Sequence, residues 1–158
     1  MLMNFKKIAL LLAGIALVAA LWLRWWLQPE RQIPRAQARL LSTIERRDFD
    51  AMSAMIAAAY RDPWQHDKTE AIAQSREVFG QFITLTITRE TRGIRAGSGA
   101  WFLSEKITFS GIGGPLAMAA RDTVNGLRAP FVMKWRQRSA KPRDWELHSV
   151  ENPQLDLP

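Results

Sequence analysis

The sequence predicts an α+β fold, in which three helices pack on an antiparallel sheet and one transmembrane helix precedes them. Three observations predict it. An uncharged run near the N-terminus has the length of a membrane span. Residues 35–80 then carry apolar side chains at the three- and four-residue spacing of amphipathic helices. From Phe82 the spacing changes to two, which is typical of strands with one buried face.

The composition is that of a globular domain without cysteine chemistry. Hydrophobic residues make up 47% of the 158 residues, which excludes an intrinsically disordered chain. The absence of cysteine excludes disulfides, thiolate metal sites and a lipoprotein anchor. The formal net charge of +7 is shared between the N-terminal segment and the body, so it does not by itself indicate nucleic-acid binding.

Residues 1–28 are predicted to be a membrane anchor. As a helix, the segment Ile8–Leu27 would span about 30 Å, the thickness of a bilayer core. Lys6 and Lys7 precede the segment, which favours a cytoplasmic N-terminus and an exported body. Three tryptophans at the end of the segment suit the far membrane interface, where amphipathic rings are favoured: Trp22, Trp25 and Trp26.

A cleaved signal peptide is the alternative interpretation of this segment. Ile8–Leu17 would form its apolar core, and Val18-Ala19-Ala20 offers the small residues that a signal peptidase accepts. Both interpretations place the body outside the cytoplasm. Residues 29–34 are expected to form a short linker stiffened by two prolines, and residues 35–158 are expected to form the domain.

The first two helices of the domain are expected to form a hairpin. The first helix begins after Pro34, and Asp48 is expected to cap the second, which ends near Tyr60. Each helix carries one apolar stripe that needs a partner. The hairpin is therefore expected to lie across the sheet and to bury Ile56.

A third helix, capped by Thr69 and ending near Gly80, leads into the strands. A short helix-like segment over 116–124 interrupts the strands after a glycine-rich bend. Because the strands follow the helices in one run, an antiparallel sheet is expected, with one face on the helices and the other solvated or paired. The alternation of apolar and polar side chains places strands over 82–90, 91–96, 100–110, 131–138 and 145–150.

Three segments carry a family resemblance: the charged break Ile44–Asp50, the exit Tyr60-Arg61-Asp62 and the closing hairpin over 131–147. Through them, residues 35–153 resemble the nuclear transport factor 2-like (NTF2-like) superfamily, also called cystatin-like or SnoaL-type. The chain is also similar to membrane-anchored bacterial members of this superfamily, in the segments Gly113–Leu116 and Val124–Leu127.

The resemblance implies a cone, in which a curved antiparallel sheet wraps around a long helix and leaves a pocket at the open end. Enzymes of the superfamily place an Asp or a His–Asp pair in that pocket, whereas many other members are binding or assembly domains. Many members dimerise through the outer face of the sheet. With the anchor, the resemblance implies a location in the bacterial inner membrane, with the domain in the periplasm or otherwise outside the cytoplasm.

Asp62 and His66 are the candidate catalytic residues, because a histidine beside a carboxylate can act as a general base. Both lie in the loop expected after the helical hairpin. In the alternative interpretation, this loop is solvated, the two side chains bind water or loop backbone, and tryptophans close the core. The pocket candidates are Tyr60, Trp64, Trp101 and Trp135.

The sequence predicts no metal, phosphate or cofactor site. His148, the only other histidine, is expected on a strand face, and the acidic residues do not show the spacing of metal ligands. The glycine-rich segment 111–115 lacks the Lys-Ser/Thr of a phosphate-binding loop, so it is interpreted as a bend between a strand and a helix.

A basic patch is expected at the closing hairpin. Alternation places its first three members on one strand face, where they could meet an anionic headgroup or an acidic partner. The other interpretation is a solvated face in which Glu146 pairs with them across the strands. The patch consists of Lys134, Arg136, Arg138, Lys141 and Arg143.

For the function, the sequence favours a membrane-anchored, exported binding or assembly module over an enzyme. Its expected partners are the lipid bilayer, a second copy through the outer sheet face, and either a protein or a small apolar ligand, but no nucleic acid. The alternatives are a cofactor-free lyase or isomerase that uses Asp62 or His66, and a carrier for a small apolar ligand. An open pocket would distinguish the alternatives from a filled core.

Overall fold

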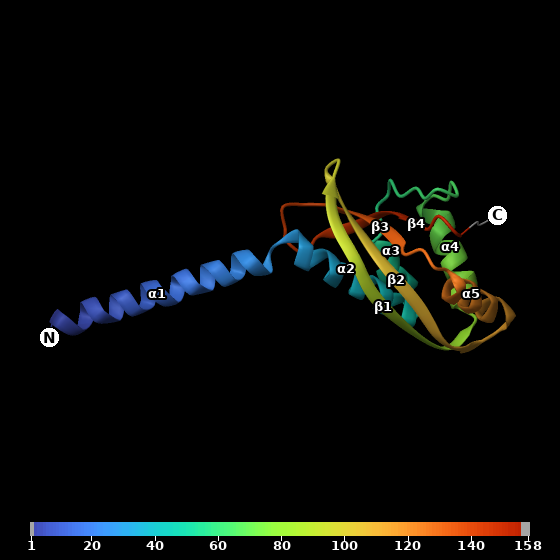
Figure 1. Cartoon of the computed structure of the whole chain (residues 1–158). Coiled ribbons are helices and arrows are strands. Elements are labelled where there is room, and N and C mark those ends of the chain that lie inside the picture. Colours follow the sequence, from blue (N-terminus) through green and yellow to red (C-terminus); the bar gives the residue numbers. More distant parts are fainter. Residues whose placement is uncertain (1, 156–158) are drawn as a thin grey trace.

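The computed structural model describes residues 2–155, which form one protruding helix and an α+β domain (Figure 1). Residue 1 of the predicted anchor and residues 156–158 of the predicted domain lie outside this range. The helices are α1 (Leu2–Trp26), α2 (Pro29–Glu45), α3 (Phe49–Ala54), α4 (Lys68–Phe79) and α5 (Pro115–Gly126). The strands are β1 (Phe82–Gly97), β2 (Ala100–Gly113), β3 (Phe131–Gln137) and β4 (Trp145–Glu151).

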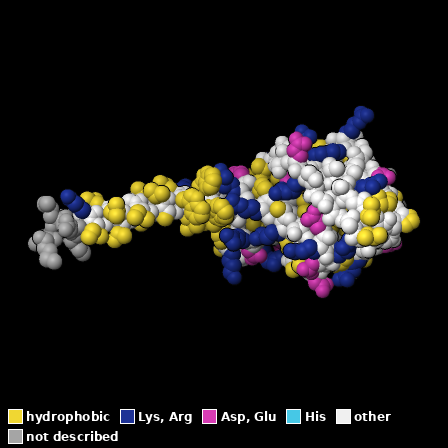
Figure 2. Space-filling view, turned by 90° about the horizontal axis from the view of Figure 1, so that it is seen from below, with side chains coloured by type: hydrophobic (Ala, Val, Ile, Leu, Met, Phe, Trp, Pro, Cys, Tyr) yellow, Lys and Arg dark blue, Asp and Glu magenta, His cyan; other side chains and the backbone are white. Residues whose placement is uncertain are grey.

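Helix α1 points away from the domain and leaves its apolar side chains exposed (Figures 1 and 2). Its window Lys7–Trp26 has 20 residues, a mean hydropathy of 2.1 and no burial against the domain. By length and composition this helix is able to cross a membrane, and a signal sequence near an N-terminus has the same properties.

Helix α2 begins at Pro29, so the residues predicted as a linker form its first turns. Pro29 stands at the start of the helix, where its missing N–H is not needed. The junction with α1 is also fixed by side chains, since the Arg31 guanidinium lies 3.3 Å from the ring centroid of Trp25. The Arg35 guanidinium lies 3.4 Å from the ring centroid of Trp26.

The second helix of the predicted hairpin is much shorter than expected. Asp48 caps it as predicted, by accepting a hydrogen bond from the backbone N–H of Ala51, but α3 ends at Ala54 rather than near Tyr60. The chain then leaves the helix to pair with the edge strand β4, because the Ala57 N–H donates to the Leu147 carbonyl. Ile56, in this paired segment, is 3% exposed and confirms the predicted burial.

Helix α4 is capped by Asp67 rather than by Thr69. The Asp67 carboxylate accepts from the Glu70 N–H at 3.0 Å, and the Glu70 carboxylate accepts from the Asp67 N–H at 2.9 Å. This reciprocal capping box satisfies two backbone donors, whereas a cap at Thr69 would satisfy one. The helix therefore starts at Lys68, two residues earlier than a cap at Thr69 would place its start.

The four strands form one antiparallel sheet in the order β1-β2-β3-β4. The two strands predicted over 82–90 and 91–96 are a single strand, β1, with a register shift between Thr91 and Gly93. A bulge at this point keeps the strand paired with β2 while bending it. The long β1–β2 hairpin therefore curves around α2, as the α+β fold with a curved sheet requires (Figure 1).

The core lies between α2 and the concave face of the sheet. Ile33 and Ala36 of α2 and Leu103 and Trp135 of the sheet are all 0% exposed. Helix α5 follows β2 and packs against it, and α4 lies beside α5 at the end of the domain farthest from α1 (Figure 1). At this end of the domain, the packing is incomplete.

Candidate functional site

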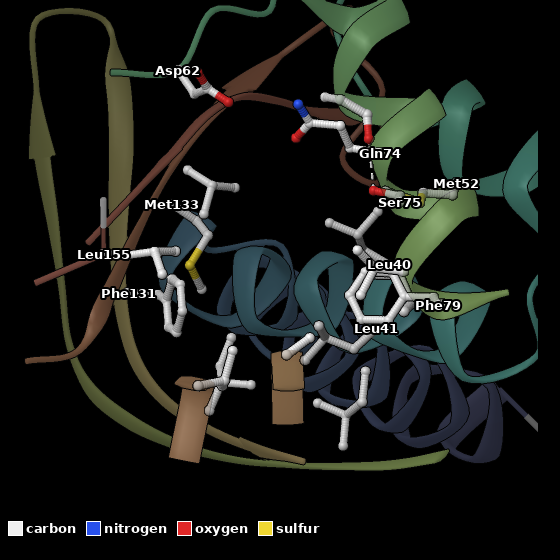
Figure 3. A pocket seen from close by; sticks show the side chains of 18 of the residues that line it. Leu40, Leu41, Met52, Asp62, Gln74, Ser75, Phe79, Phe131, Met133 and Leu155 are labelled. Atoms are coloured by element: carbon white, nitrogen blue, oxygen red, sulfur yellow. Dashed lines mark hydrogen bonds between the residues drawn. The ribbon is translucent and has the colours of Figure 1, made fainter. Parts of the chain in front are cut away.

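A cavity of about 480 Å³ opens between α2, α4, α5 and the sheet (Figure 3). Most of its wall is apolar and comes from side chains that also form the core, such as Leu40, Leu41, Phe79, Phe131 and Met133. Ligand sites have this character, a largely apolar wall with a few polar groups that fix orientation. The polar members of the wall are Gln37, Tyr60, Asp62, His66, Gln74, Ser75 and Thr123.

The loop between α3 and α4 places Asp62 and His66 in the wall of the cavity. Asp62 Oδ1 accepts from the His66 backbone N–H at 2.9 Å, and Gln65 turns the loop with a φ of 72°. Asp62 Oδ2 lies 3.1 Å from His66 Nδ1. The Asp62 residue is 6% exposed, so its carboxylate is held against the imidazole in a site from which most water is excluded.

Two further side chains extend this contact into a chain of hydrogen bonds. The Tyr60 hydroxyl donates to Asp62 Oδ2 at 3.5 Å. Burial raises the pKa of the Tyr60 phenol, and the neighbouring Asp62 carboxylate raises it further, so the phenol remains a donor. At the other end, Gln74 Nε2 lies 2.9 Å from His66 Nε2.

The amide of Gln74 indicates which imidazole nitrogen carries the proton. An amide nitrogen can only donate, so in a neutral ring the His66 Nε2 accepts from it. Nδ1 then holds the proton and donates to Asp62. In Figure 3, Asp62 and Gln74 both point into the cavity from opposite sides of its upper rim. A ligand group that displaces Gln74 would meet the lone pair of Nε2.

The pocket candidates are divided between different places. Tyr60 and Trp64 line the cavity, and the Trp64 indole donates to the Leu155 carbonyl at 3.0 Å. Trp101 instead lines a separate hollow at the opposite end of the domain, next to Pro29. Trp135 is 0% exposed and lines neither. The three tryptophans therefore do not close the cavity, contrary to the packing expected for a filled core.

Sequence analysis missed Gln37, Gln74 and the contribution of α5 to the wall. Gln37 lies on the apolar stripe of α2, three and four residues before Leu40 and Leu41, and a polar residue in such a stripe was the available signal. Gln74 lies in a helix without a fully buried residue, so no pattern singled it out. Within residues 2–155, no group of three His, Asp or Glu side chains is arranged to hold a metal ion.

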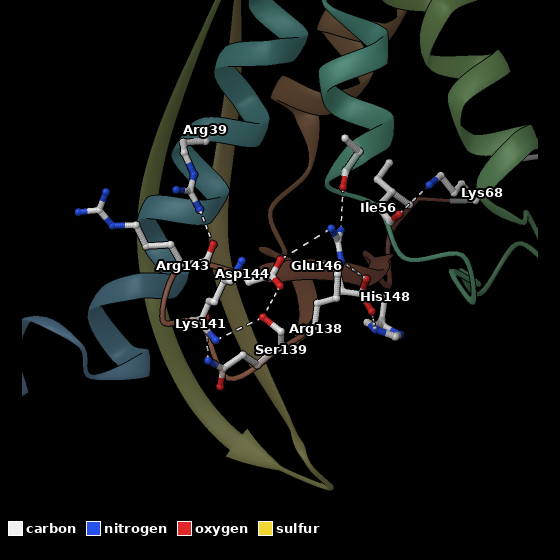
Figure 4. A network of polar contacts seen from close by, with 12 residues as sticks. Arg39, Ile56, Lys68, Arg138, Ser139, Lys141, Arg143, Asp144, Glu146 and His148 are labelled. Carbon is white, nitrogen blue, oxygen red and sulfur yellow. Dashed lines mark hydrogen bonds and ion pairs between the residues drawn. The ribbon is translucent and has the colours of Figure 1, made fainter.

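One member of the basic patch, Arg138, is engaged through its side chain in contacts within the protein (Figure 4). Arg138 Nε donates to Glu146 Oε2 at 2.9 Å, and Arg138 Nη2 donates to the Ala54 carbonyl at 2.8 Å. Glu146 also contacts His148 Nε2 at 3.0 Å. Burial acts to raise the pKa of Glu146, but the hydrogen bonds from Arg138 and His148 outweigh it and leave that pKa below its ordinary value.

The remaining members of the patch are dispersed. Arg143 and Lys141 contribute backbone carbonyls, which accept from Arg39 and Gln137, rather than their charged groups. The Lys134 ammonium lies 6.0 Å from the ring centroid of Phe102, and Arg136 Nε is buried without a hydrogen-bond partner. The cross-strand partner expected at Glu146 is present, and it holds the hairpin to the end of α3 through Arg138. These contacts make the hairpin a structural tie.

Comparison with known proteins places the fold. No family model matches the sequence, and no curated protein matches it. Among solved structures, an NTF2-like protein from Cytophaga hutchinsonii superposes with a TM-score of 0.55 at 14% identity, covering 78% of this chain and 95% of that one. A candidate dehydratase of the NTF2-like family from Streptomyces avermitilis gives 0.56 at 13% identity, covering 78% and 95%.

A third similar structure comes from a longer chain. A Bdellovibrio bacteriovorus protein gives a TM-score of 0.58 at 5% identity and covers 77% of this chain, which spans only 38% of that protein. Identities this low carry information about the fold and none about the activity. The helices and the curved four-stranded sheet agree with these structures, and the protein therefore has the NTF2-like fold.

Proposed function

We propose that the protein binds a small, mainly apolar molecule in the cavity and acts on it as a cofactor-free lyase or isomerase. The observation that carries this proposal is the buried Asp62–His66 contact in the wall of an apolar cavity of about 480 Å³. Strongly apolar pockets with a few convergent polar groups are the usual form of small-molecule sites. The candidate dehydratase with the same fold is consistent with this class of chemistry.

The arrangement is suited to moving one proton. His66 Nε2 would take a proton from a carbon of the ligand next to an electron-withdrawing group, and the C–H electron pair would move toward that group. Asp62 would hold the ring through Nδ1 and stabilise the imidazolium. The imidazolium would then return the proton to another atom, for isomerisation, or to a leaving group, for elimination. Neither the isomerisation nor the elimination needs a redox partner.

One contact favours a second candidate, a carrier for the same class of ligand. Gln74 donates to His66 Nε2, so the one basic lone pair of the neutral ring already accepts a hydrogen bond from within the protein. If Gln74 stays in place when the ligand binds, the polar chain serves only to orient the loop. The two candidates share the cavity and the ligand class, and they differ in whether bound ligand exchanges a proton.

Proton exchange is the measurement that separates these candidates. The full chain, in detergent micelles in D₂O, is mixed with 1-tetralone, a neutral ketone whose α-hydrogens exchange slowly, and deuterium incorporation is followed by mass spectrometry. An enzyme should accelerate exchange on the order of 10²–10⁴-fold, the usual contribution of a positioned general base. His66→Gln and Asp62→Asn should remove the acceleration while ketone binding remains.

His148→Gln is the matched control, because His148 is the other histidine of the chain and does not line the cavity. Its exchange rate should equal that of the wild type. If the wild type binds the ketone but does not accelerate its deuterium exchange, the proposed enzymatic function is rejected and the carrier function remains. Acceleration that survives His66→Gln and Asp62→Asn would reject the residue assignment.

We also propose that α1 anchors the domain in the bacterial inner membrane, with the cavity on the periplasmic side. The support is the exposed apolar surface of α1 and the belt where it joins the domain (Figure 2). There Trp22 stacks on Trp26 at 5.3 Å, and Arg31 and Arg35 lie over tryptophan rings. Aromatic rings and arginines suit the headgroup level of a bilayer. Intact mass of membrane-extracted protein tests this, since a chain beginning at Leu21 would reject the anchor.

A further inference from the structure

Gln37 is a buried polar side chain without a described partner in an otherwise apolar setting. It lines the cavity, is 2% exposed, and its Oε1 forms no hydrogen bond. Its neighbours on the same face of α2 are Ile33, Leu40 and Leu41. Buried amides are almost always paired, and an unpaired one destabilises the fold because the group has lost its water.

The rest of the wall limits what a partner for this amide can be. The residues that line the cavity include no Lys or Arg, so nothing there would neutralise a carboxylate or phosphate. Transfer of an unpaired charge into such a site is strongly unfavourable. Because Oε1 only accepts, a neutral hydroxyl or N–H donor carried on an apolar skeleton is compatible with both the amide and the wall.

We infer that Gln37 determines ligand specificity, by accepting a hydrogen bond at Oε1 from a hydroxyl or N–H group of an otherwise apolar, uncharged ligand. This inference rests on the proposed use of the cavity and adds the ligand class to it. Asp62–His66 and Gln37 come from a loop and from α2, so they approach the cavity from different elements. One ligand can therefore be oriented by Gln37 while another of its atoms faces His66.

The matched control for Gln37 is Gln32 on the same helix. Gln32 is 3% exposed, similar to Gln37, but its Nε2 donates to the Trp26 carbonyl and it does not line the cavity. Gln32→Leu removes a paired amide, whereas Gln37→Leu removes an unpaired one. The two substitutions are chemically identical and should have opposite effects on stability.

The stability measurement needs no ligand. In the full chain in micelles, Gln37→Leu should raise the melting temperature by roughly 2–4 °C, because it replaces an unpaired buried amide by an apolar group of similar size. Gln32→Leu should lower it, since the Trp26 carbonyl loses its donor. A fall in melting temperature with Gln37→Leu would show that the amide is structurally satisfied and would overturn the inference.

The binding measurement uses two probes of nearly equal shape, 1-(2-naphthyl)ethanol and 2-isopropylnaphthalene, which differ in having a hydroxyl or a methyl group. The wild type should prefer the alcohol by about tenfold, which corresponds to one good hydrogen bond from its hydroxyl to Gln37 Oε1. Gln37→Leu should abolish this preference without weakening the binding of the hydrocarbon. Gln32→Leu should leave the preference unchanged. A preference unaffected by Gln37→Leu would overturn the inference.

These outcomes are separable from failure of the proposed catalysis. If Gln37→Leu abolishes the preference for the polar naphthalene but 1-tetralone shows no accelerated deuterium exchange, the specificity role stands and the protein is a carrier. If exchange is accelerated and Gln37→Leu changes neither binding nor stability, the enzyme stands and the specificity role is wrong. If neither naphthalene binds the wild type, the cavity does not take this ligand class, and the inference is rejected.

Discussion

The two ends of the domain are built from the same two layers but differ in how completely they are packed. Near α1, Ile33 and Ala36 of α2 meet Leu103 and Trp135 of the sheet, and all four are 0% exposed. At the other end, α2, α4, α5 and the sheet enclose a cavity of about 480 Å³. The closed end supplies stability, and the open end gives up packing for a space that can hold a ligand.

This difference also separates the kinds of contact that hold each end. The closed end depends on burial of large apolar side chains, which stabilise the fold in proportion to the area they remove from water. The open end combines apolar contacts, such as the packing of Phe79 on Phe109, with backbone and polar contacts, such as the Asp67–Glu70 capping box. Such polar contacts fix geometry at a modest net gain in free energy.

The largest expected effect comes from removing a leucine at each end. Leu103→Ala should lower the free energy of unfolding by about 2–5 kcal/mol, because a fully packed side chain leaves a cavity that cannot collapse. Leu116→Ala, at the rim of the open cavity, should cost less than about 1 kcal/mol, since Leu116 is already 37% exposed. Chemical denaturation of the full chain in micelles measures both. Equal costs would mean that the two ends are packed alike.

The next effect follows from adding volume instead of removing it. Ala120→Phe should fill part of the cavity and weaken 1-(2-naphthyl)ethanol binding by about tenfold or more, while the free energy of unfolding changes by less than about 1 kcal/mol. Ala36→Phe is the matched variant at the closed end. It should overpack the core and cost at least about 1–3 kcal/mol. Tight binding by Ala120→Phe would show that ligands occupy another site.

The sequence predicted those parts of the fold that depend on neighbouring residues. The apolar stripe of α2, the strand that begins at Phe82 and the cap at Asp48 are local patterns, and the structure confirms them. The alternation in β1 is broken at its start, where a register shift between Phe82 and Thr84 buries Phe82 and exposes Ile83. The early end of α3 was missed because the partner of Ala57 is Leu147, a residue far along the chain. The continuity of β1 was missed for the same reason, since a bulge and a break look alike until β2 is paired with it.

The candidate site was predicted only in part, for a related reason. Asp62, His66 and Tyr60 stand close together in the sequence, so their types and spacing were visible. Whether they face a space is decided by α4 and α5, which contribute small and apolar residues with no chemical signature. Gln37 could have been noticed, because a polar residue in an apolar stripe needs a hydrogen-bond partner. Only the structure shows that its Oε1 has none within the protein.

The smallest expected effect concerns the polar tie at the closing hairpin and its dependence on pH. Glu146 has a pKa below its ordinary value in the folded protein, so its charged form stabilises the fold. This contribution is fully present above the pKa of the unfolded chain and is lost as the pH falls through the folded pKa. Glu146→Gln should therefore lower the free energy of unfolding at pH 7, and the difference from the wild type should shrink as the pH falls from about 5 toward 3.

The matched control is Glu90→Gln, at an exposed ion pair with Arg92. Pairs of this kind contribute little, so the substitution should change the free energy of unfolding only slightly at pH 7. Unlike the Glu90–Arg92 pair, Glu146 is linked through Arg138 to the Ala54 carbonyl, and its loss should loosen the hairpin from α3. A Glu146→Gln effect that stays constant from pH 7 to pH 3 would show that the carboxylate charge does not hold the tie. The hairpin would then depend on the packing of Trp145 and Leu147 against the closed end.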